Sequence, residues 1–485
     1  MKISLKRILI CIFAVLIVAG TLFALSGCGK SCIHKYENYN CIRCGVTDEE
    51  CFEFTYHIDT DSYSVRSKNN SPLSNLQSVS IPDTYNGKPV TVIEDRSFMH
   101  LYSTTEITIP NSITHIGEHA FANCERLINL SISDNVTSIG EYAFRGCSQL
   151  KSVVIPDSIE LIDEYTFSNC SGLRSLVIGD SVKAIGNNAF EYCRSLTNVV
   201  IPDNVDTIGS HAFAWCTNLA DVTISDGVTS IGAFSFFSCG LKSVVIPDSV
   251  TSVGECAFQN CPTLKSVVIG DGVTSISHSM FMTCSGLTSI LIPDSVKSIG
   301  DNAFMSCSSL TSIAIPDSVE YIGRYGFAYC YKLTSVVIPD GVTSIHQGAF
   351  LNCSGLTSIV IPDGVESIDE IAFQGCSNLK DVVLPDSITS IGNNAFCNCD
   401  SFESFVIPDS VTSIGYNTFA YCDKLTSVVI PDSVESIGRN AFEYCPRLAD
   451  IYYTGTKEEW ARINIDSPND NLSNVTIHYN YVPEE

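Results

Sequence analysis

The stretch AFEYCRSLTNVVIPDNVDTIG, residues 189–209, carries the pattern that decides the fold. Close copies of it follow one another along the chain, and their cysteines lie 23 residues apart except for one step of 22. These cysteines are Cys124, Cys147, Cys170, Cys193, Cys216, Cys239, Cys261, Cys284, Cys307, Cys330, Cys353, Cys376, Cys399, Cys422 and Cys445. Repeats of this length stack as coils, so that like residues form columns and share one core. We therefore predict a single solenoid over residues 76–450.

Each repeat divides into segments with different patterns. Val199 and Ile201 alternate with the residue between them, which indicates a short strand with one buried face. The pair Pro202-Asp203 indicates a turn, because proline fixes φ and aspartate can bond the backbone. Residues 205–208 make a second extended segment, and the link to Cys216 is long enough for about one helical turn. The predicted fold is a β-rich solenoid with short parallel strands and one short helical turn per coil.

Both ends of the repeat region depart from the pattern. Residues 80–98 form a degenerate first coil, which leads to Phe98. Residues 451–485 lose the pattern and finish in an apolar alternation at Val475, Ile477 and Tyr479. Because a stack of coils exposes its core only at its two ends, we interpret these segments as caps.

Residues 1–27 have the layout of a secretory signal peptide: Lys2, Lys6 and Arg7 precede an apolar run, and small residues follow. Residues 25–28, Leu-Ser-Gly-Cys, resemble the bacterial lipobox, in which the cysteine accepts a diacylglycerol. Cys28 would then begin the mature chain and anchor it to the membrane, because two or more acyl chains hold a protein stably on a bilayer. The alternative is an uncleaved transmembrane anchor. We assign residues 28–75 to a lipidated N-terminal segment that acts as a stalk.

The formal net charge is −26, and removal of the three cations of the signal peptide leaves −29 for the mature chain. A surface this acidic repels phosphate backbones and anionic lipid headgroups, which argues against nucleic acid as a partner. Attachment to the membrane must therefore come from the lipid.

The recurring pattern I-P-x-x-V-x-x-I-G-x-x-A-F-x-x-C-x-x-L resembles the BspA-like leucine-rich-repeat family of bacterial surface proteins, from about Leu76 to Tyr481. The segment from Tyr453 to Trp460 is also similar to the tail of that family. The resemblance implies a leucine-rich-repeat solenoid displayed at the cell surface. It also implies adhesion in some members, either to host matrix proteins such as fibronectin and fibrinogen or to other bacteria. Because repeats serve many functions, the fold transfers better than the ligand.

The fifteen cysteines of the repeat allow two interpretations. Metal or redox chemistry is one, because thiols would stack once per coil. A buried column is the other, because each cysteine has a core position, as Cys193 does between Phe190 and Leu196, and free cysteine is often buried. Their odd number excludes complete pairing within the column. Cys256 and Cys397 lie outside it, in distant coils.

A second group of cysteines follows the signal peptide. Cys41 and Cys44 have the spacing of a zinc knuckle, and Cys32 with His34 or Cys51 could complete a tetrahedral site. Disulfides are the competing interpretation, because the chain is exported. The sequence leaves both open, and it indicates no other cofactor.

A column of aspartates also recurs, after the proline or glycine of each turn. Its members are Asp157, Asp180, Asp203, Asp248, Asp294, Asp317, Asp409 and Asp432. Stacked carboxylates could bind calcium. A local role in the turn is the simpler interpretation, because no second acidic position recurs to complete a coordination shell.

Catalysis requires unlike residues that converge on one place. The nine histidines are scattered, mostly out of register with the repeat, and the chain has no nucleophile elbow, phosphate loop or paired histidine motif. We therefore expect a protein that is not an enzyme.

The candidate binding surface consists of one residue per coil, which lies between the two buried positions of the strand. Alternation directs it away from the core, beside polar residues such as Ser152 and Ser335. These residues, here called the sheet stripe, are Val154, Val177, Val200, Val245, Val268, Leu291, Val337, Val360, Val383, Val406 and Val429. An exposed apolar strip of this length favours a partner surface, whereas simple β-propensity is the alternative explanation. Aromatic residues just before the repeat cysteine predict a second contact strip: Tyr192, Trp215, Tyr329, Tyr421 and Tyr444.

The function that these features favour is adhesion. The lipid would hold the base at the cell surface, residues 29–75 would act as the stalk, and the sheet stripe would bind host or bacterial surface proteins of the extracellular-matrix type. The alternative is a passive structural scaffold, in which the repeats provide only length and durability.

Overall fold

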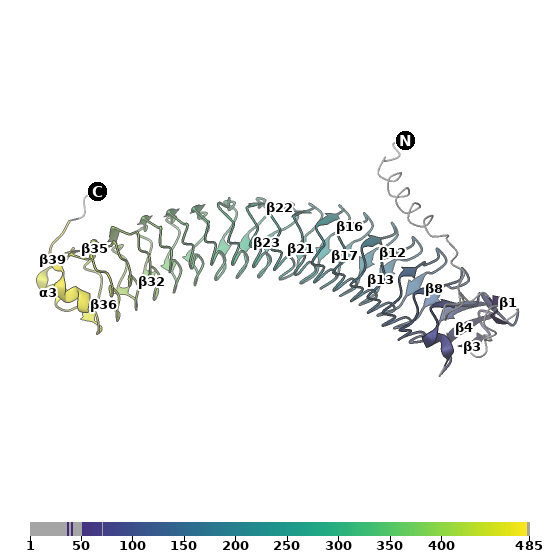
Figure 1. Ribbon diagram of the computed structural model, residues 1–485. Coiled ribbons are helices and arrows are strands. Elements are labelled where there is room, and N and C mark those ends of the chain that lie inside the picture. The colour runs from purple at the N-terminus through teal and green to yellow at the C-terminus, as the bar shows by residue number, and fades with distance from the viewer. Residues whose placement is uncertain (1–35, 38–39, 42–50, 70, 483–485) are drawn as a thin grey trace.

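The structure, a computed structural model, describes residues 36–37, 40–41, 51–69 and 71–482. Figure 1 shows an elongated, gently arched rod of coils that follow one another from the N-terminal to the C-terminal end. The predicted parallel-strand solenoid is confirmed. Within the described ranges, no helix has both the length and the apolar character needed to cross a membrane.

The first wall of the rod is built from the strands that hold the sheet stripe. Where neighbouring strands pair, they are parallel, and all but β5 with β8 join residues 23 positions apart, as in Val153 with Leu176 and Val154 with Val177. The strands are β5 (Ser78–Ser80), β8 (Glu106–Thr108), β10 (Asn129–Leu130), β12 (Ser152–Val154), β14 (Ser175–Val177), β16 (Asn198–Ile201), β18 (Asp221–Ile224), β20 (Ser243–Ile246), β22 (Ser266–Ile269), β24 (Ser289–Leu291), β27 (Ser335–Val337), β29 (Ser358–Val360), β31 (Asp381–Val383), β33 (Ser404–Val406) and β35 (Ser427–Ile430).

A second wall is built from the two-residue strands that follow the Pro-Asp turns. Its strands are also parallel, and in β17 and β19 Ile208 pairs with Ile231. The strands are β9 (His115–Ile116), β11 (Ser138–Ile139), β13 (Leu161–Ile162), β15 (Ala184–Ile185), β17 (Thr207–Ile208), β19 (Ser230–Ile231), β21 (Ser252–Val253), β23 (Ser275–Ile276), β25 (Ser298–Ile299), β26 (Tyr321–Ile322), β28 (Ser344–Ile345), β30 (Ser367–Ile368), β32 (Ser390–Ile391), β34 (Ser413–Ile414) and β36 (Ser436–Ile437).

The segment before each repeat cysteine, here called the turn wall, forms stacked turns where the sequence predicted about one helical turn. Two of its residues per coil have positive φ, as His119 (56°) and Asn123 (59°) do before Cys124. A right-handed helix requires negative φ, so these residues end any helix before it can propagate. Their N–H groups instead reach the next coil: His119 N donates to Glu141 O at 2.9 Å and Asn123 N to Arg145 O at 2.7 Å. All three walls are thus held by hydrogen bonds between coils.

The core between the walls consists of continuous columns. A phenylalanine from each coil stacks on the next in an unbroken series from Phe98 to Phe442, with ring centroids from 5.2 Å apart (Phe121 and Phe144) to 5.8 Å apart (Phe258 and Phe281). The repeat cysteines form a second buried column. Because each coil covers the apolar side chains of its neighbour, only the two ends of the rod need caps.

The N-terminal end is covered by an antiparallel hairpin, β3 (Phe52–His57) with β4 (Ser62–Ser67), which lies within the segment 28–75. β4 pairs in parallel with β7 (Lys88–Ile93), and Phe52 packs edge-on against Phe98 at 6.0 Å. The other described elements here are β1 (Tyr36–Glu37), β2 (Asn40–Cys41), η1 (Pro72–Asn75) and β6 (Thr84–Tyr85). The hairpin thereby extends the second wall to the N-terminal side of residue 76.

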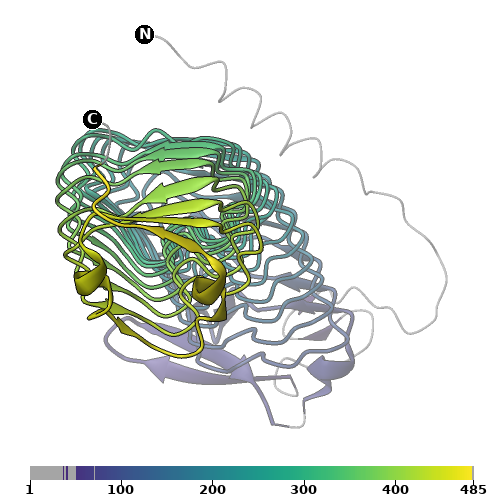
Figure 2. The same ribbon diagram turned by 90° about the vertical axis from the view of Figure 1, so that its left-hand side faces the viewer.

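The C-terminal end, which faces the viewer in Figure 2, is closed by strands that continue both walls. β37 (Asp450–Tyr453) and β39 (Thr476–His478) extend the first wall, and β38 (Asn464–Ile465) pairs with β36. Between them lie η2 (Asp470–Asn474) and α3 (Lys457–Trp460), whose N-terminus has a capping box formed by Thr456 and Glu459. The Trp460 ring packs edge-on against Tyr453 at 5.1 Å.

Candidate binding surface

The sheet stripe lies on the outside of the first wall. Val154 is 53% exposed, Val360 66% and Val383 80%, and Val177 and Val429 are half-buried. The neighbouring strand residues point inward, since Val153 is 1% exposed. In Figure 1 the first-wall strands β12, β16 and β22 run above the second-wall strands β13, β17 and β23, along the outer side of the arch. The stripe is therefore open to solvent along the rod.

Strand pairing places the stripe residues side by side. Val337, Val360 and Val383 are paired in sequence, as are Val245, Val268 and Leu291. Thr223 and Ala314 occupy the equivalent position in two coils, and both are exposed. The series of Val and Leu side chains is thus divided into three runs, by a polar residue at Thr223 and by a small apolar residue at Ala314.

The stripe continues into the C-terminal cap. The cap was predicted from the sequence, but this extension of the stripe was not. Val429 pairs with Tyr452, and Tyr452 pairs with His478. The Tyr452 ring stacks on His478 at 4.7 Å and contacts Tyr481 at 4.8 Å, and His478 Nε2 lies 2.8 Å from Asp450 Oδ1. The alternation in Asp-Ile-Tyr-Tyr, residues 450–453, was the signal that could have revealed this extension.

The aromatic residues before the repeat cysteines do not form one continuous strip. Tyr192 stacks on Trp215 at 5.8 Å, and Tyr421 stacks on Tyr444 at 4.6 Å. Tyr329 lies apart from both pairs, beside Tyr331. The structure therefore separates this expected strip into local stacks on the turn wall.

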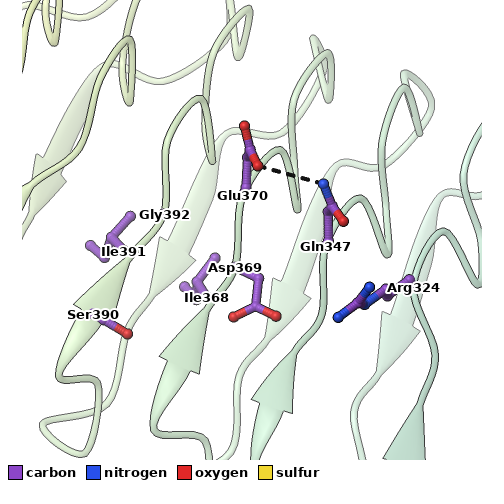
Figure 3. Close-up of a pocket in the computed structure, with 8 residues that line it drawn as sticks. All are labelled: Arg324, Gln347, Ile368, Asp369, Glu370, Ser390, Ile391 and Gly392. Atoms are coloured by element: carbon purple, nitrogen blue, oxygen red, sulfur yellow. Dashed lines mark hydrogen bonds between the residues drawn. The ribbon is translucent and has the colours of Figure 1, made fainter.

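Figure 3 shows a shallow depression that crosses several coils of the second wall. Arg324, Gln347 and Glu370 follow one another along it, and Gln347 Nε2 donates to Glu370 Oε2 at 3.5 Å. Asp369 lies 3.2 Å from His346 Nδ1. These side chains form a row of surface contacts along the rod, without a nucleophile and a base directed at one point.

Each described repeat cysteine donates its thiol to a backbone carbonyl of the preceding coil. Cys170 Sγ lies 3.3 Å from Phe144 O, which also accepts the N–H of Cys147 at 3.2 Å. The same contact recurs along the column, from 3.0 Å at Cys445 to 3.4 Å at Cys147. A residue that is both apolar and able to donate a weak hydrogen bond suits this position, which explains the recurrence of cysteine.

Residues 69–463 match the BspA type leucine-rich repeat region, in overlapping segments 69–196, 137–265, 183–311, 229–357 and 345–463. The chain belongs to this family. Its repeats are those of a leucine-rich-repeat solenoid, an architecture that typically provides a binding scaffold.

The chain is also similar to solved structures. The BspA-type chain is 26% identical to a leucine-rich repeat protein from Bacteroides ovatus, with a TM-score of 0.51, and the match covers 88% of this chain and 98% of that one. A leucine-rich cell surface protein from Faecalibacterium prausnitzii is also 26% identical, with a TM-score of 0.42 and coverage of 90% and 99%. No curated protein sequence matches the chain.

The BspA-type thiol column is chemically shielded. Every cysteine in residues 71–482 is a free thiol and is buried, including Cys256 and Cys397 outside the column. Burial raises the pKa of the Cys170 and Cys216 thiols to about 12, because a thiolate would lose its hydration. A high pKa and burial both suppress the reactive thiolate, so these properties oppose redox or metal chemistry at these positions. At the C-terminal end of the column, the hydrogen bond with Cys422 instead lowers the pKa of Cys445.

We expect the repeat cysteines to resist alkylation in the native protein. In the full chain treated with N-ethylmaleimide near pH 8 and mapped by mass spectrometry, peptides that contain Cys170, Cys216 and Cys330 should remain unlabelled. The same peptides should be labelled after unfolding in urea. Labelling of these cysteines in the native chain at the rate of a small free thiol would contradict the buried column.

Two members of the aspartate column bond the backbone of the next turn. Asp157 Oδ1 accepts a hydrogen bond from Asp180 N at 2.8 Å, and Asp248 Oδ1 accepts one from Asp271 N at 3.0 Å. Each of these carboxylates thus bonds the backbone of the next coil. In the part of the chain that the structure describes, no three acidic, histidine or cysteine side chains gather as a metal site would require.

The N-terminal candidates remain predictions. The signal peptide with Cys28, and the possible metal ligands Cys32, His34 and Cys44, lie outside the described residues, and only the backbone of Cys41 is described, in β2. Cys51 is described and is buried at the N-terminal end of the core.

Proposed function

We propose that the chain is a cell-surface adhesion protein, which binds an extended segment of another protein along the sheet stripe. The partner would be a surface protein of the host or of a neighbouring cell, of the extracellular-matrix type. The single observation that carries this proposal is the exposure of the stripe residues in coil after coil. This role requires binding and no catalysis.

The energetics of the stripe support a partner. Full burial of a valine side chain contributes about 1.5–3 kcal/mol, and Val337, Val360 and Val383 are 67%, 66% and 80% exposed. Monomeric proteins rarely leave large contiguous apolar surfaces uncovered. A partner that covers even one run of the stripe would gain several such contributions, before the cost of association is subtracted.

The anchor in this proposal is the lipid on Cys28, which a signal peptide of residues 1–27 would deliver. The charge supports this mode of attachment, because a chain with a net charge of −26 is repelled by anionic lipid headgroups. The described N-terminal hairpin covers the N-terminal end of the core, and the stripe residues along the rod remain exposed.

Substitution of the stripe tests the proposal. In a pull-down of the full chain with immobilised fibronectin and fibrinogen, Val360→Lys/Val383→Lys should weaken binding at least tenfold, because two lysines would have to lose hydration in the contact. The matched control is Thr274→Lys/Thr343→Lys, which adds the same charge at exposed positions of the second wall. Equal binding by both variants would show that the sheet stripe is not the binding surface. Absence of binding to any matrix protein by the unsubstituted chain would favour a passive scaffold.

A further inference from the structure

A cluster of aromatic rings lies on the turn wall, away from the sheet stripe. It consists of Tyr192, His211, Trp215, Phe234 and Phe237, here called the aromatic patch, and all five residues are half-buried. They come from three consecutive coils, those of Cys193, Cys216 and Cys239. The patch is therefore compact, whereas the stripe extends along the rod.

The rings of the patch form two columns that Phe237 joins. Tyr192 and Trp215 stack with planes 10° apart, and His211 and Phe234 stack at 4.8 Å with planes 12° apart. Phe237 meets Trp215 edge-on at 5.1 Å and Phe234 at 5.7 Å. Because the stacked rings cover one another's faces, the columns present ring rims to solvent, with the Phe237 ring between them.

The backbone alone does not account for these residues. Trp215 has a φ of 62° and Phe234 a φ of 57°, in the left-handed region that bulky residues rarely adopt. Asparagine, which tolerates this region better, occupies the same two positions in later coils, as Asn394 and Asn398 do before Cys399. The aromatic residues therefore occupy these positions at a conformational cost, as Tyr421 and Tyr444 also do, and the patch differs from that pair in its Phe237 ring and its bordering charges.

The patch also has polar groups without a protein partner. Neither the Trp215 indole N–H nor the Tyr192 hydroxyl has a hydrogen bond within the described ranges. The Arg194 guanidinium lies over the Tyr192 ring, 5.4 Å from its centroid. Glu191 and the exposed Glu255 border the patch in a chain whose net charge is −26. A suitable ligand would accept hydrogen bonds, pack against ring rims and carry positive charge at its ends.

We propose that the aromatic patch binds a proline-rich protein segment in the polyproline II conformation. Such a segment has no internal hydrogen bonds, so its carbonyl groups are free to accept from Trp215 and Tyr192. One of its turns spans about 9 Å, and two coils of the solenoid span about 10 Å at the ~4.8 Å spacing of paired strands. A segment that lies along the rod would therefore place equivalent prolines near Tyr192 and Phe237, which are two coils apart.

This conformation also limits the cost of binding. A polyproline II segment is already extended, so little chain entropy is lost when it docks against aromatic residues. Arginines that flank the prolines would complement the acidic surface. A sugar would need an open ring face, and stacking covers the faces within each column of the patch.

The test uses the fluorescence of Trp215. In the full chain with Trp460→Phe, Trp215 is the remaining tryptophan, because the sequence has two. A proline-only peptide flanked by arginines should change its emission saturably. The matched peptide, with the same arginines and with alanine in place of proline, should bind at least tenfold more weakly. Equal binding of the two peptides, or a response only to a neutral oligosaccharide, would overturn the proposal.

Variants distinguish the patch from the rest of the surface. Trp215→Ala and Phe237→Ser should each weaken binding of a fluorescently labelled proline peptide at least tenfold, whereas Tyr421→Ala/Tyr444→Ala should leave it unchanged. Far-ultraviolet circular dichroism checks that each variant is folded. Val360→Lys/Val383→Lys should not change the binding of this peptide. The proposals for the patch and for the stripe can therefore be tested independently. Unchanged binding of the peptide by both Trp215→Ala and Phe237→Ser would show that the aromatic patch is not its binding site.

Discussion

Replacement of Phe281 by alanine is expected to lower the free energy of unfolding by about 3–5 kcal/mol. Phe281 is fully buried, and its ring lies between those of Phe258 at 5.8 Å and Phe304 at 5.6 Å. Alanine would leave a cavity that neither ring can fill, because each is also stacked on the next coil. Urea unfolding followed by circular dichroism measures the change.

An exposed position provides the control. Val383→Ala, at a residue that is 80% exposed, should change the free energy of unfolding by about 0.5 kcal/mol or less. Since each coil contacts only its neighbours, the effect of Phe281→Ala should be concentrated in the adjacent coils. Hydrogen exchange should therefore accelerate most between about residues 258 and 304. A loss below 1 kcal/mol in Phe281→Ala would contradict the continuous phenylalanine column.

The walls and the core could be predicted because their signals are local and repeated. Alternation at Val199 and Ile201 indicates which side chains are buried in a strand, and the period of 23 indicates which residues stack. A single repeat would have been ambiguous. Fifteen copies in register leave one arrangement in which every Phe and every Cys occupies the same place.

The turn wall was predicted less well, because a short link of this length is compatible with one helical turn. What excludes the helix is the left-handed conformation at two positions per coil, as at Asn394 and Asn398. The recurrence of asparagine at these positions was the available signal. Four residues of the aromatic patch, Tyr192, His211, Trp215 and Phe234, occupy the same two positions, and their columns form only when neighbouring coils both hold rings.

The ends were harder to predict for a different reason. The hairpin of β3 and β4 contains no copy of the repeat, and its place depends on pairing with β7, more than twenty residues further along the chain. The extension of the stripe to Tyr452 and His478 likewise depends on β39, which returns after α3 and β38. Long-range pairing of unique segments leaves no periodic pattern for the sequence to reveal.

The role of the repeat cysteines could be predicted only in part. Their position between Phe and Leu indicates burial, which is confirmed. The thiol hydrogen bond from Cys170 to Phe144 O depends on the offset between two coils, and composition does not reveal it. Because these thiols are buried and bonded in their neutral form, the stability of the solenoid should depend on pH in the alkaline range.

Above about pH 9 we expect the solenoid to lose stability steeply. Burial raises the pKa of the thiols of Cys124, Cys147, Cys170, Cys193, Cys216, Cys239, Cys284, Cys307, Cys330, Cys353, Cys376 and Cys399 from the ordinary value of 9.0. The folded chain thus keeps protons that the unfolded chain releases. The stability due to neutral thiols is therefore complete below pH 9 and is lost as the pH rises toward the folded-state pKa, which is about 12 for Cys170.

The loss should be large because the thiols act together. Above the unfolded-state pKa, each buried thiol lowers the free energy of unfolding by about 1.4 kcal/mol per pH unit. About a dozen thiols therefore lower it by on the order of 15–20 kcal/mol per pH unit. A loss of this size over one or two units is comparable to the whole stability of a chain of this length. Circular dichroism, with reductant present throughout, should show unfolding at about pH 10–11.

A variant that lacks part of the cysteine column distinguishes the contribution of the thiols to alkaline unfolding from that of other groups that titrate at high pH. In Cys170→Ala/Cys193→Ala/Cys216→Ala, three carbonyl contacts and some packing are lost, so the urea midpoint at pH 7 should be lower than in the unsubstituted chain. The variant also has three fewer thiols to ionise on unfolding, which removes about 4 kcal/mol of the loss per pH unit above pH 9. The two stability curves should therefore approach each other as the pH rises and then cross. Parallel curves from pH 7 to pH 11 would show that other groups cause the alkaline unfolding, and that the buried thiols keep no protons that the unfolded chain would release.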